Sequence, residues 1–146
     1  MKRFVWRLQR VLEIEKKEEQ KTRAELLELT ERLAQARGEL HIRKKMLESI
    51  IEKLAEENPQ KRLGDQEFFL KYSTSSIEQI RELEENVHVL ESRQKEKIAE
   101  VLRVRKFKEG LERLRVQAKM QFIRRQEKLE QKELDEGATI SFVRKS

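Results

Sequence analysis

The chain has 146 residues, of which 42% are charged and 5% aromatic, with four Gly and one Pro. So few large apolar side chains cannot fill an ordinary globular core, and the excess of Glu, Lys, Arg, Leu, Gln and Ala is typical of long helices and coiled coils. Because the chain has no Cys, disulfides and thiol chemistry are excluded. The sequence also predicts neither a signal peptide nor a membrane span.

The formal net charge of +6 is unevenly distributed. Residues 100–128 hold ten Lys and Arg against four Asp and Glu, so the rest of the chain is close to neutral. A basic stretch of this kind raises the association rate with an acidic partner, whether protein, nucleic acid or membrane surface.

The first half of the chain carries apolar residues at alternating spacings of three and four, which is the repeat of a left-handed coiled coil. A helix is therefore predicted over about residues 2–57, ending at Asn58-Pro59 because proline cannot continue the helical hydrogen bonds. The predicted core positions of this helix are Leu8, Leu12, Leu26, Leu29, Leu33, Leu40, Leu47, Ile50 and Leu54.

A connection is predicted over residues 58–75, and it contains Phe68, Phe69 and Tyr72. A second helix is predicted over about 76–136, with a capping-box spacing at its start and Gly137 at its end. Residues 137–146 would form a short tail. The predicted core positions of the second helix are Ile80, Leu83, Val87, Leu90, Val101, Val104, Leu111, Ala118, Phe122 and Leu129.

Two helices of similar length with a short connection are expected to fold back on each other. The predicted fold is all-α, a long two-helix antiparallel coiled-coil hairpin that forms one domain over residues 1–146. Setting Leu54 opposite Ile80 places Glu19 opposite Arg115, so that an acidic part of one helix faces a basic part of the other. The same register leaves Leu26 opposite Lys108, which is a poor match.

Residue patterns for catalysis are missing from the sequence. His41 and His88 are the two histidines, and a metal site needs three or four ligands. Phosphate-binding glycine motifs and a serine paired with a histidine are also absent. We therefore predict a protein that is not an enzyme, with no catalytic residue, metal, cofactor or small-molecule ligand.

The two ends of the chain resemble one family. The opening run Phe4–Ile14 (FVWRLQRVLEI) and the closing run Leu129–Glu136 (LEQKELDE), followed by a basic tail, are similar to the FliJ family of flagellar type III export proteins. This resemblance implies a central stalk inserted in the hexameric export ATPase, which promotes the assembly and activity of the ATPase. It further implies a link to the membrane export gate, escort of export chaperones, and a cytoplasmic location, held by these partners at the inner face of the cell membrane at the flagellar base.

The resemblance also points to contact residues. The expected ATPase contacts lie near the two chain ends: Phe4, Trp6, Arg7, Arg10, Arg124, Arg125, Lys128 and Lys132. The expected export-gate contacts are Phe68, Phe69 and Tyr72. Tyr72 stands where the family usually has Phe, Ser76 where it has Leu, and Gly137 where it more often has a bulky apolar residue.

Two other functions fit a charged coiled coil. One is a generic coiled-coil adaptor, and the other is a basic nucleic-acid-binding coiled coil. We predict no nucleic-acid partner, because the basic residues alternate with acids and few aromatic side chains are available for base stacking.

Overall fold

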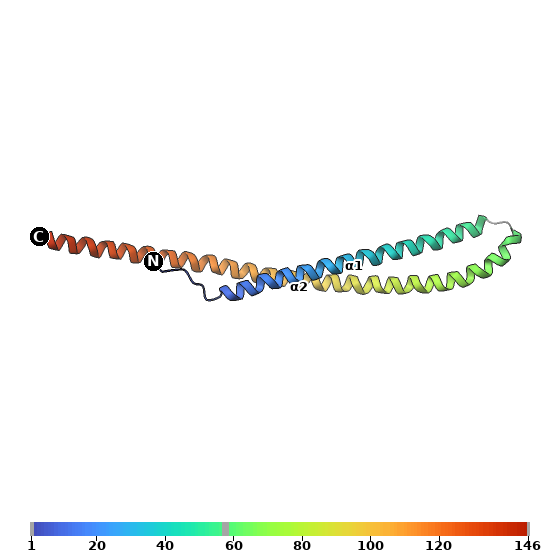
Figure 1. Ribbon diagram of the computed structural model, residues 1–146, viewed down its shortest axis with the longest axis horizontal. Coiled ribbons are helices and arrows are strands. Elements are labelled where there is room, and N and C mark those ends of the chain that lie inside the picture. The colour runs from blue at the N-terminus through green and yellow to red at the C-terminus, as the bar shows by residue number, and fades with distance from the viewer. Residues whose placement is uncertain (1, 57–58, 146) are drawn as a thin grey trace. The chain divides into compact units, whose positions relative to one another are not determined.

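The computed structural model describes residues 2–56 and 59–145, and this part of the chain is an all-α helical hairpin, as predicted from the sequence. Helix α1 spans Gln9–Glu56 and helix α2 spans Pro59–Lys145. Figure 1 shows that the two helices run in opposite directions. No helix in the described residues is long and apolar enough to cross a membrane.

Both helices differ in extent from the sequence prediction. Helix α1 begins at Gln9 rather than near residue 2, and residues 2–6 have no regular structure. The predicted stop at Asn58 falls outside the described residues. Helix α2 already begins at Pro59, so residues 59–75 are helical rather than a loop. Proline suits the first position of a helix, where its fixed φ is favourable and its missing N–H is not needed.

The predicted tail is also helical, up to Lys145. A glycine ends a helix most readily when it adopts a positive φ, and no glycine with a positive φ occurs among the described residues. Within a helix, glycine costs only about 1 kcal/mol relative to alanine. Helix α2 therefore continues through Gly137 rather than ending there.

Contacts divide the chain into two units. The turn unit, Thr22–Val101, has a core of buried Leu33, Ala36, Val87 and Leu90, against which Leu29 and Leu40 pack. Two ion pairs cross from α1 to α2 beside this core: Arg37 with Glu91 at 3.0 Å and Lys44 with Glu84 at 3.1 Å. Exposed pairs of this kind add at most about 1 kcal/mol each, so the apolar core supplies most of the stability of this unit.

The terminal unit combines Met1–Lys21 with Leu102–Ser146. Leu12 and Leu111 are buried between its two helical segments. A charged pair lies in the same interface: Glu19, whose relative exposure is 4%, forms an ion pair with Lys108. The interface of the terminal unit is therefore partly polar, whereas the turn unit has a cluster of four buried apolar residues.

The register of the two helices differs from the predicted one by one heptad. Glu19 pairs with Lys108, seven residues before the predicted partner Arg115, and Arg115 donates instead to Gln9. A shift of seven leaves the apolar pattern of a heptad repeat unchanged, so periodicity alone cannot choose between the two registers. The predicted register was set from a loop over residues 58–75, and residues 59–75 are helical in the structure. The shift also removes the mismatch of Leu26 with Lys108.

Candidate partner-binding surfaces

The N-terminal segment folds against α2 within the terminal unit. The ring of Phe4 lies 5.5 Å from the ring of Phe122, centroid to centroid, and the guanidinium carbon of Arg115 lies 5.8 Å from the Phe4 centroid. The Nε of Arg115 donates a hydrogen bond of 2.8 Å to Oε1 of Gln9, the first residue of α1. These contacts pack Phe4 and the first residue of α1 against α2, while residues 2–8 precede the helix.

Two of the expected ATPase contacts are aromatic and lie in this segment. Phe4 and Trp6 are both half-buried. A hollow of about 230 Å³ beside Phe122 and Ile123 is also lined by Lys2. Phe4 therefore completes the packing of the terminal unit, and only part of its ring remains available to another protein.

The cations expected to contact the ATPase are all exposed: Arg7, Arg10, Arg124, Arg125, Lys128 and Lys132. None of them forms an ion pair with another residue in the described part of the chain. They are thus free to meet acidic groups on a partner.

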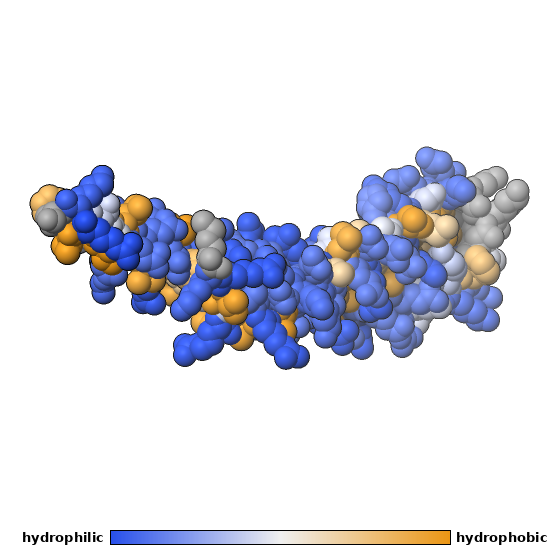
Figure 2. All heavy atoms as spheres, turned by 60° about the vertical axis from the view of Figure 1, so that its left-hand side comes forward, coloured by the Kyte–Doolittle hydropathy of each residue, from blue (hydrophilic) through white to orange (hydrophobic). Residues whose placement is uncertain are grey.

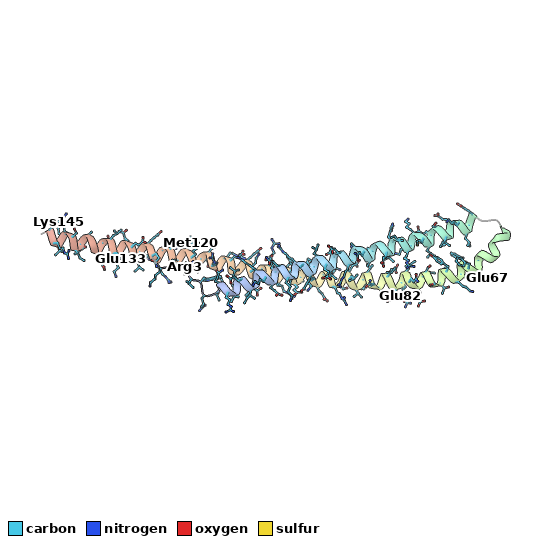
Figure 3. All side chains as sticks on the ribbon, viewed as in Figure 1. Arg3, Glu67, Glu82, Met120, Glu133 and Lys145 are labelled. Carbon is cyan, nitrogen blue, oxygen red and sulfur yellow. The ribbon has the colours of Figure 1, made fainter. Side chains whose placement is uncertain are left out.

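The last turns of α2 have no helix beside them within the terminal unit. Every side chain from residue 127 to residue 145 is exposed, including Glu133 and Lys145, which are labelled in Figure 3. Leu129 is 50% exposed, so the prediction that it lies in the core is wrong. In the observed register α1 begins too late in the chain to reach Leu129.

The other predicted core residues are buried or half-buried. Leu12, Leu33, Val87, Leu90 and Leu111 are among the most buried. The heptad pattern therefore identified the inward face of each helix even though it did not identify the register.

The expected export-gate residues lie on α2 in the turn unit. Phe68 is 69% exposed, and its ring stacks on the ring of Tyr72 with centroids 6.3 Å apart. Phe69 and Tyr72 are half-buried. The hydroxyls of Ser73 and Thr74 both donate to the backbone carbonyl of Leu70, at 3.1 and 2.8 Å. Such bonds occupy hydroxyl groups within a helix and tend to bend it slightly.

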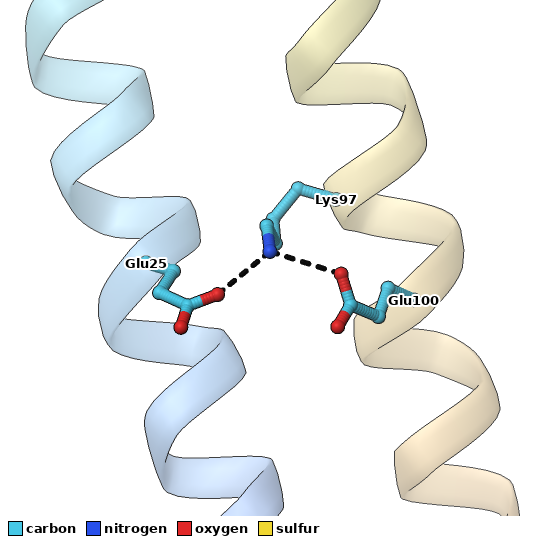
Figure 4. A network of polar contacts seen from close by, with 3 residues as sticks. All are labelled: Glu25, Lys97 and Glu100. Carbon is cyan, nitrogen blue, oxygen red and sulfur yellow. Dashed lines mark hydrogen bonds and ion pairs between the residues drawn. The ribbon is translucent and has the colours of Figure 1, made fainter.

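A three-residue charge network in the turn unit was not anticipated from the sequence. The Nζ of Lys97 lies 2.6 Å from a carboxylate oxygen of Glu25 on α1 and 2.9 Å from one of Glu100 on α2 (Figure 4). The hydrogen bond to Glu25, and next that to Glu100, raises the pKa of Lys97 above its ordinary value. The available signal was that Lys97 follows the spacing of three and four of the apolar residues, with acids nearby. The register predicted from the sequence did not place Glu25 of α1 opposite it.

The two units differ strongly in charge. The terminal unit holds 20 Lys and Arg against 11 Asp and Glu, a formal net charge of +9, whereas the turn unit holds 14 against 17, a net charge of −3. The excess positive charge of the protein is thus confined to the paired chain ends. Within the described residues, no group of three or more His, Cys, Asp or Glu side chains could hold a metal ion.

Comparison with known proteins identifies the family. A family model described as "Flagellar FliJ protein" matches residues 3–146, which is nearly the whole chain. No curated protein and no solved structure is similar enough to match. The match extends over both helices and over the N-terminal segment, in agreement with the resemblance of the two chain ends. The chain belongs to the FliJ family and is a component of the flagellar protein-export apparatus.

Proposed function

We propose that this protein is the central stalk of the hexameric flagellar export ATPase. The terminal unit enters the pore of the ATPase ring, promotes ring assembly and raises the rate of ATP hydrolysis. The protein carries out no catalysis itself. It lies in the cytoplasm at the base of the flagellum and reaches the membrane through its partners.

The observation that carries this proposal is the combination of the family match with the charge of the paired chain ends. The family match covers residues 3–146, and the terminal unit has a net charge of +9. Its exposed cations, Arg124 and Arg125 among them, make no ion pair with another described residue. Unpaired charges at an interface mainly steer and orient the partners. A stalk that enters a pore needs such orientation.

The proposal also assigns a role to the turn unit. The stacked pair Phe68 and Tyr72, with Phe69 beside it, contacts the membrane export gate. An exposed aromatic ring such as that of Phe68 suits a contact anchor, because aromatic side chains dominate many binding interfaces. The protein also escorts export chaperones, in keeping with the resemblance to the family.

The test is ATP hydrolysis by the export ATPase of the same export system, measured with and without this protein. We expect the wild-type protein to increase turnover and ring formation. The Arg124→Glu/Arg125→Glu variant is expected to lose at least about tenfold in affinity for the ring, since reversing a charge at an interface costs more than about 1 kcal/mol.

The matched control is Arg93→Glu/Lys95→Glu, which makes the same change in net charge on exposed residues of α2 in the turn unit. This control is expected to stimulate the ATPase like the wild type. If the folded wild-type protein neither stimulates nor binds the ATPase, the stalk proposal is wrong and a generic coiled-coil adaptor is the better description.

A further inference from the structure

One side of α2 in the terminal unit carries a row of cations. The row consists of Arg103, Lys106, Arg113, Arg124, Lys128 and Lys132, called the basic face below. The successive spacings are three, seven, eleven, four and four residues. Each is close to a whole number of turns at about 3.6 residues per turn, so the six side chains share one side of the helix.

Acidic residues of the same stretch lie elsewhere on α2. Glu109, Glu112, Glu127 and Glu130 repeat at their own helical spacing, centred roughly a third of a turn from the basic face. The basic face ends at Asp135, which is the next acid on that side of the helix. It therefore extends for about 44 Å along α2, at about 1.5 Å per residue, without an acidic side chain along its line.

The cations of the basic face differ from three cations that lie off it. All six on the face are exposed, and none forms an ion pair with another residue that the structure describes. Off the face, Arg105 pairs with Glu109 at 3.2 Å, Lys108 pairs with Glu19, and Arg115 donates to Gln9. The charge of the basic face is thus not neutralised within the protein.

Apolar side chains lie among these charges. Phe107 and Leu114, one heptad apart on the same side, are 54% and 50% exposed. Figure 2 shows a largely hydrophilic surface on which apolar side chains are interspersed. Binding of a helix to a membrane surface draws on electrostatic attraction to anionic lipids and on burial of apolar side chains, and this side of α2 offers both kinds of group.

We propose that the basic face binds the surface of a membrane rich in anionic phospholipids. The six cations contact lipid phosphates, and Phe107 and Leu114 enter the headgroup region. Duplex nucleic acid fits less well, because its phosphates curve away from a long helix and offer no apolar layer for these two side chains. Single-stranded nucleic acid would find one aromatic side chain, Phe107, on this face for base stacking.

This proposal adds a direct lipid contact to the membrane links through partners proposed above, and it can be tested apart from the stalk function. The basic face shares Arg124, Lys128 and Lys132 with the proposed ATPase contact, so the test uses the other three cations. The full-length protein is mixed with vesicles of phosphatidylcholine alone, or of phosphatidylcholine and phosphatidylglycerol in equal parts, and binding is measured by co-sedimentation. Helicity is checked by circular dichroism for every variant.

We expect binding to the anionic vesicles that weakens with salt, and little binding to the neutral ones. Arg103→Glu/Lys106→Glu/Arg113→Glu should reduce the affinity by about 100-fold or more, given the contribution of each cation near an anionic surface. Lys17→Glu/Arg105→Glu/Lys119→Glu has the same net charge but spares the face, and it should bind almost as the wild type does. Phe107→Ser/Leu114→Ser should weaken vesicle binding at high salt in particular.

Equal losses in the two charge-reversal variants would overturn the proposal, because net charge and not the face would then control binding. Equal binding to neutral vesicles would overturn it too. A random-sequence DNA duplex serves as competitor: if it binds more tightly than the anionic vesicles, and only the basic-face variant loses that binding, nucleic acid is the partner instead. The stalk is tested by a different measurement, ATP hydrolysis by the export ATPase, so the failure of one proposal does not decide the other.

Discussion

The turn unit and the terminal unit use the same two helices but differ in what lies between them. In the turn unit, Leu33 and Ala36 of α1 pack on Val87 and Leu90 of α2. In the terminal unit, the partly buried ion pair of Glu19 with Lys108 lies in the same interface as Leu12 and Leu111. The turn unit has a net charge of −3 and the terminal unit one of +9.

This comparison indicates a division of roles between the units. Apolar burial is the main favourable term in folding, so the turn unit should account for most of the stability of the hairpin. A like-charged surface repels itself and slightly destabilises the folded state, but it attracts oppositely charged partners. The terminal unit is therefore expected to be less stable than the turn unit, but its surface is suited to binding.

The largest expected effect is in the core of the turn unit. Leu33 is 1% exposed, and Leu33→Ala should lower the free energy of unfolding by about 2–4 kcal/mol, since it removes buried methyl groups and leaves a cavity. Urea unfolding followed by circular dichroism measures the change. Leu27→Ala, at an exposed position of the same helix, should stay within about 0.5 kcal/mol of the wild type. Similar losses in both variants would mean that the turn unit has no dominant core.

A smaller effect is expected from the ion pair of the terminal unit. Lys108→Leu leaves the buried carboxylate of Glu19 without its partner on α2. We expect a loss of about 2 kcal/mol, less than for a fully buried pair because the side chain of Lys108 keeps some exposure. Glu19→Leu/Lys108→Leu should recover most of this loss or exceed the stability of the wild type, because it replaces the pair by apolar contacts.

Both variants are compared in the same urea unfolding experiment. If the double variant is as unstable as Lys108→Leu alone, the polar interface does not weaken the terminal unit. The contrast between the two units would then rest on net charge only.

Much of the fold could be predicted from the sequence because helical periodicity is local. The alternation of three and four identified the inward face of each helix, and Leu12, Leu33 and Leu111 are buried as expected. Register is a long-range property, and a heptad repeat is unchanged by a shift of seven. The correct partner of Glu19 could be found only by weighing individual polar pairs such as Glu19 with Lys108.

The candidate sites were predicted less completely for a related reason. The exposed cations near the chain ends are visible in the sequence because Lys and Arg in such numbers must face water. The packing of Phe4 on Phe122 and Arg115 depends on a segment that leaves the helix. The sequence of this N-terminal segment still follows the helical spacing, so no local signal distinguishes a helical from a non-helical conformation there. The basic face lies within the helix that was predicted over about residues 76–136, but the sequence does not show which cations of this helix are paired in the fold, as Arg105 is with Glu109 and Lys108 with Glu19.

The smallest expected effect comes from two glycines, one in each unit. A Cβ added at Gly38 or at Gly110 would meet no atom within 4 Å. Alanine is favoured over glycine inside a helix by about 0.5–1 kcal/mol, so Gly38→Ala and Gly110→Ala should each stabilise the hairpin by about that amount. Urea unfolding again gives the value.

The pair of variants also shows which unit unfolds in the main transition. A gain in stability for Gly38→Ala with none for Gly110→Ala would mean that the terminal unit is already unfolded when the turn unit unfolds. Equal gains would mean that both units unfold together, and the partly polar interface of the terminal unit would then hold as firmly as the apolar core.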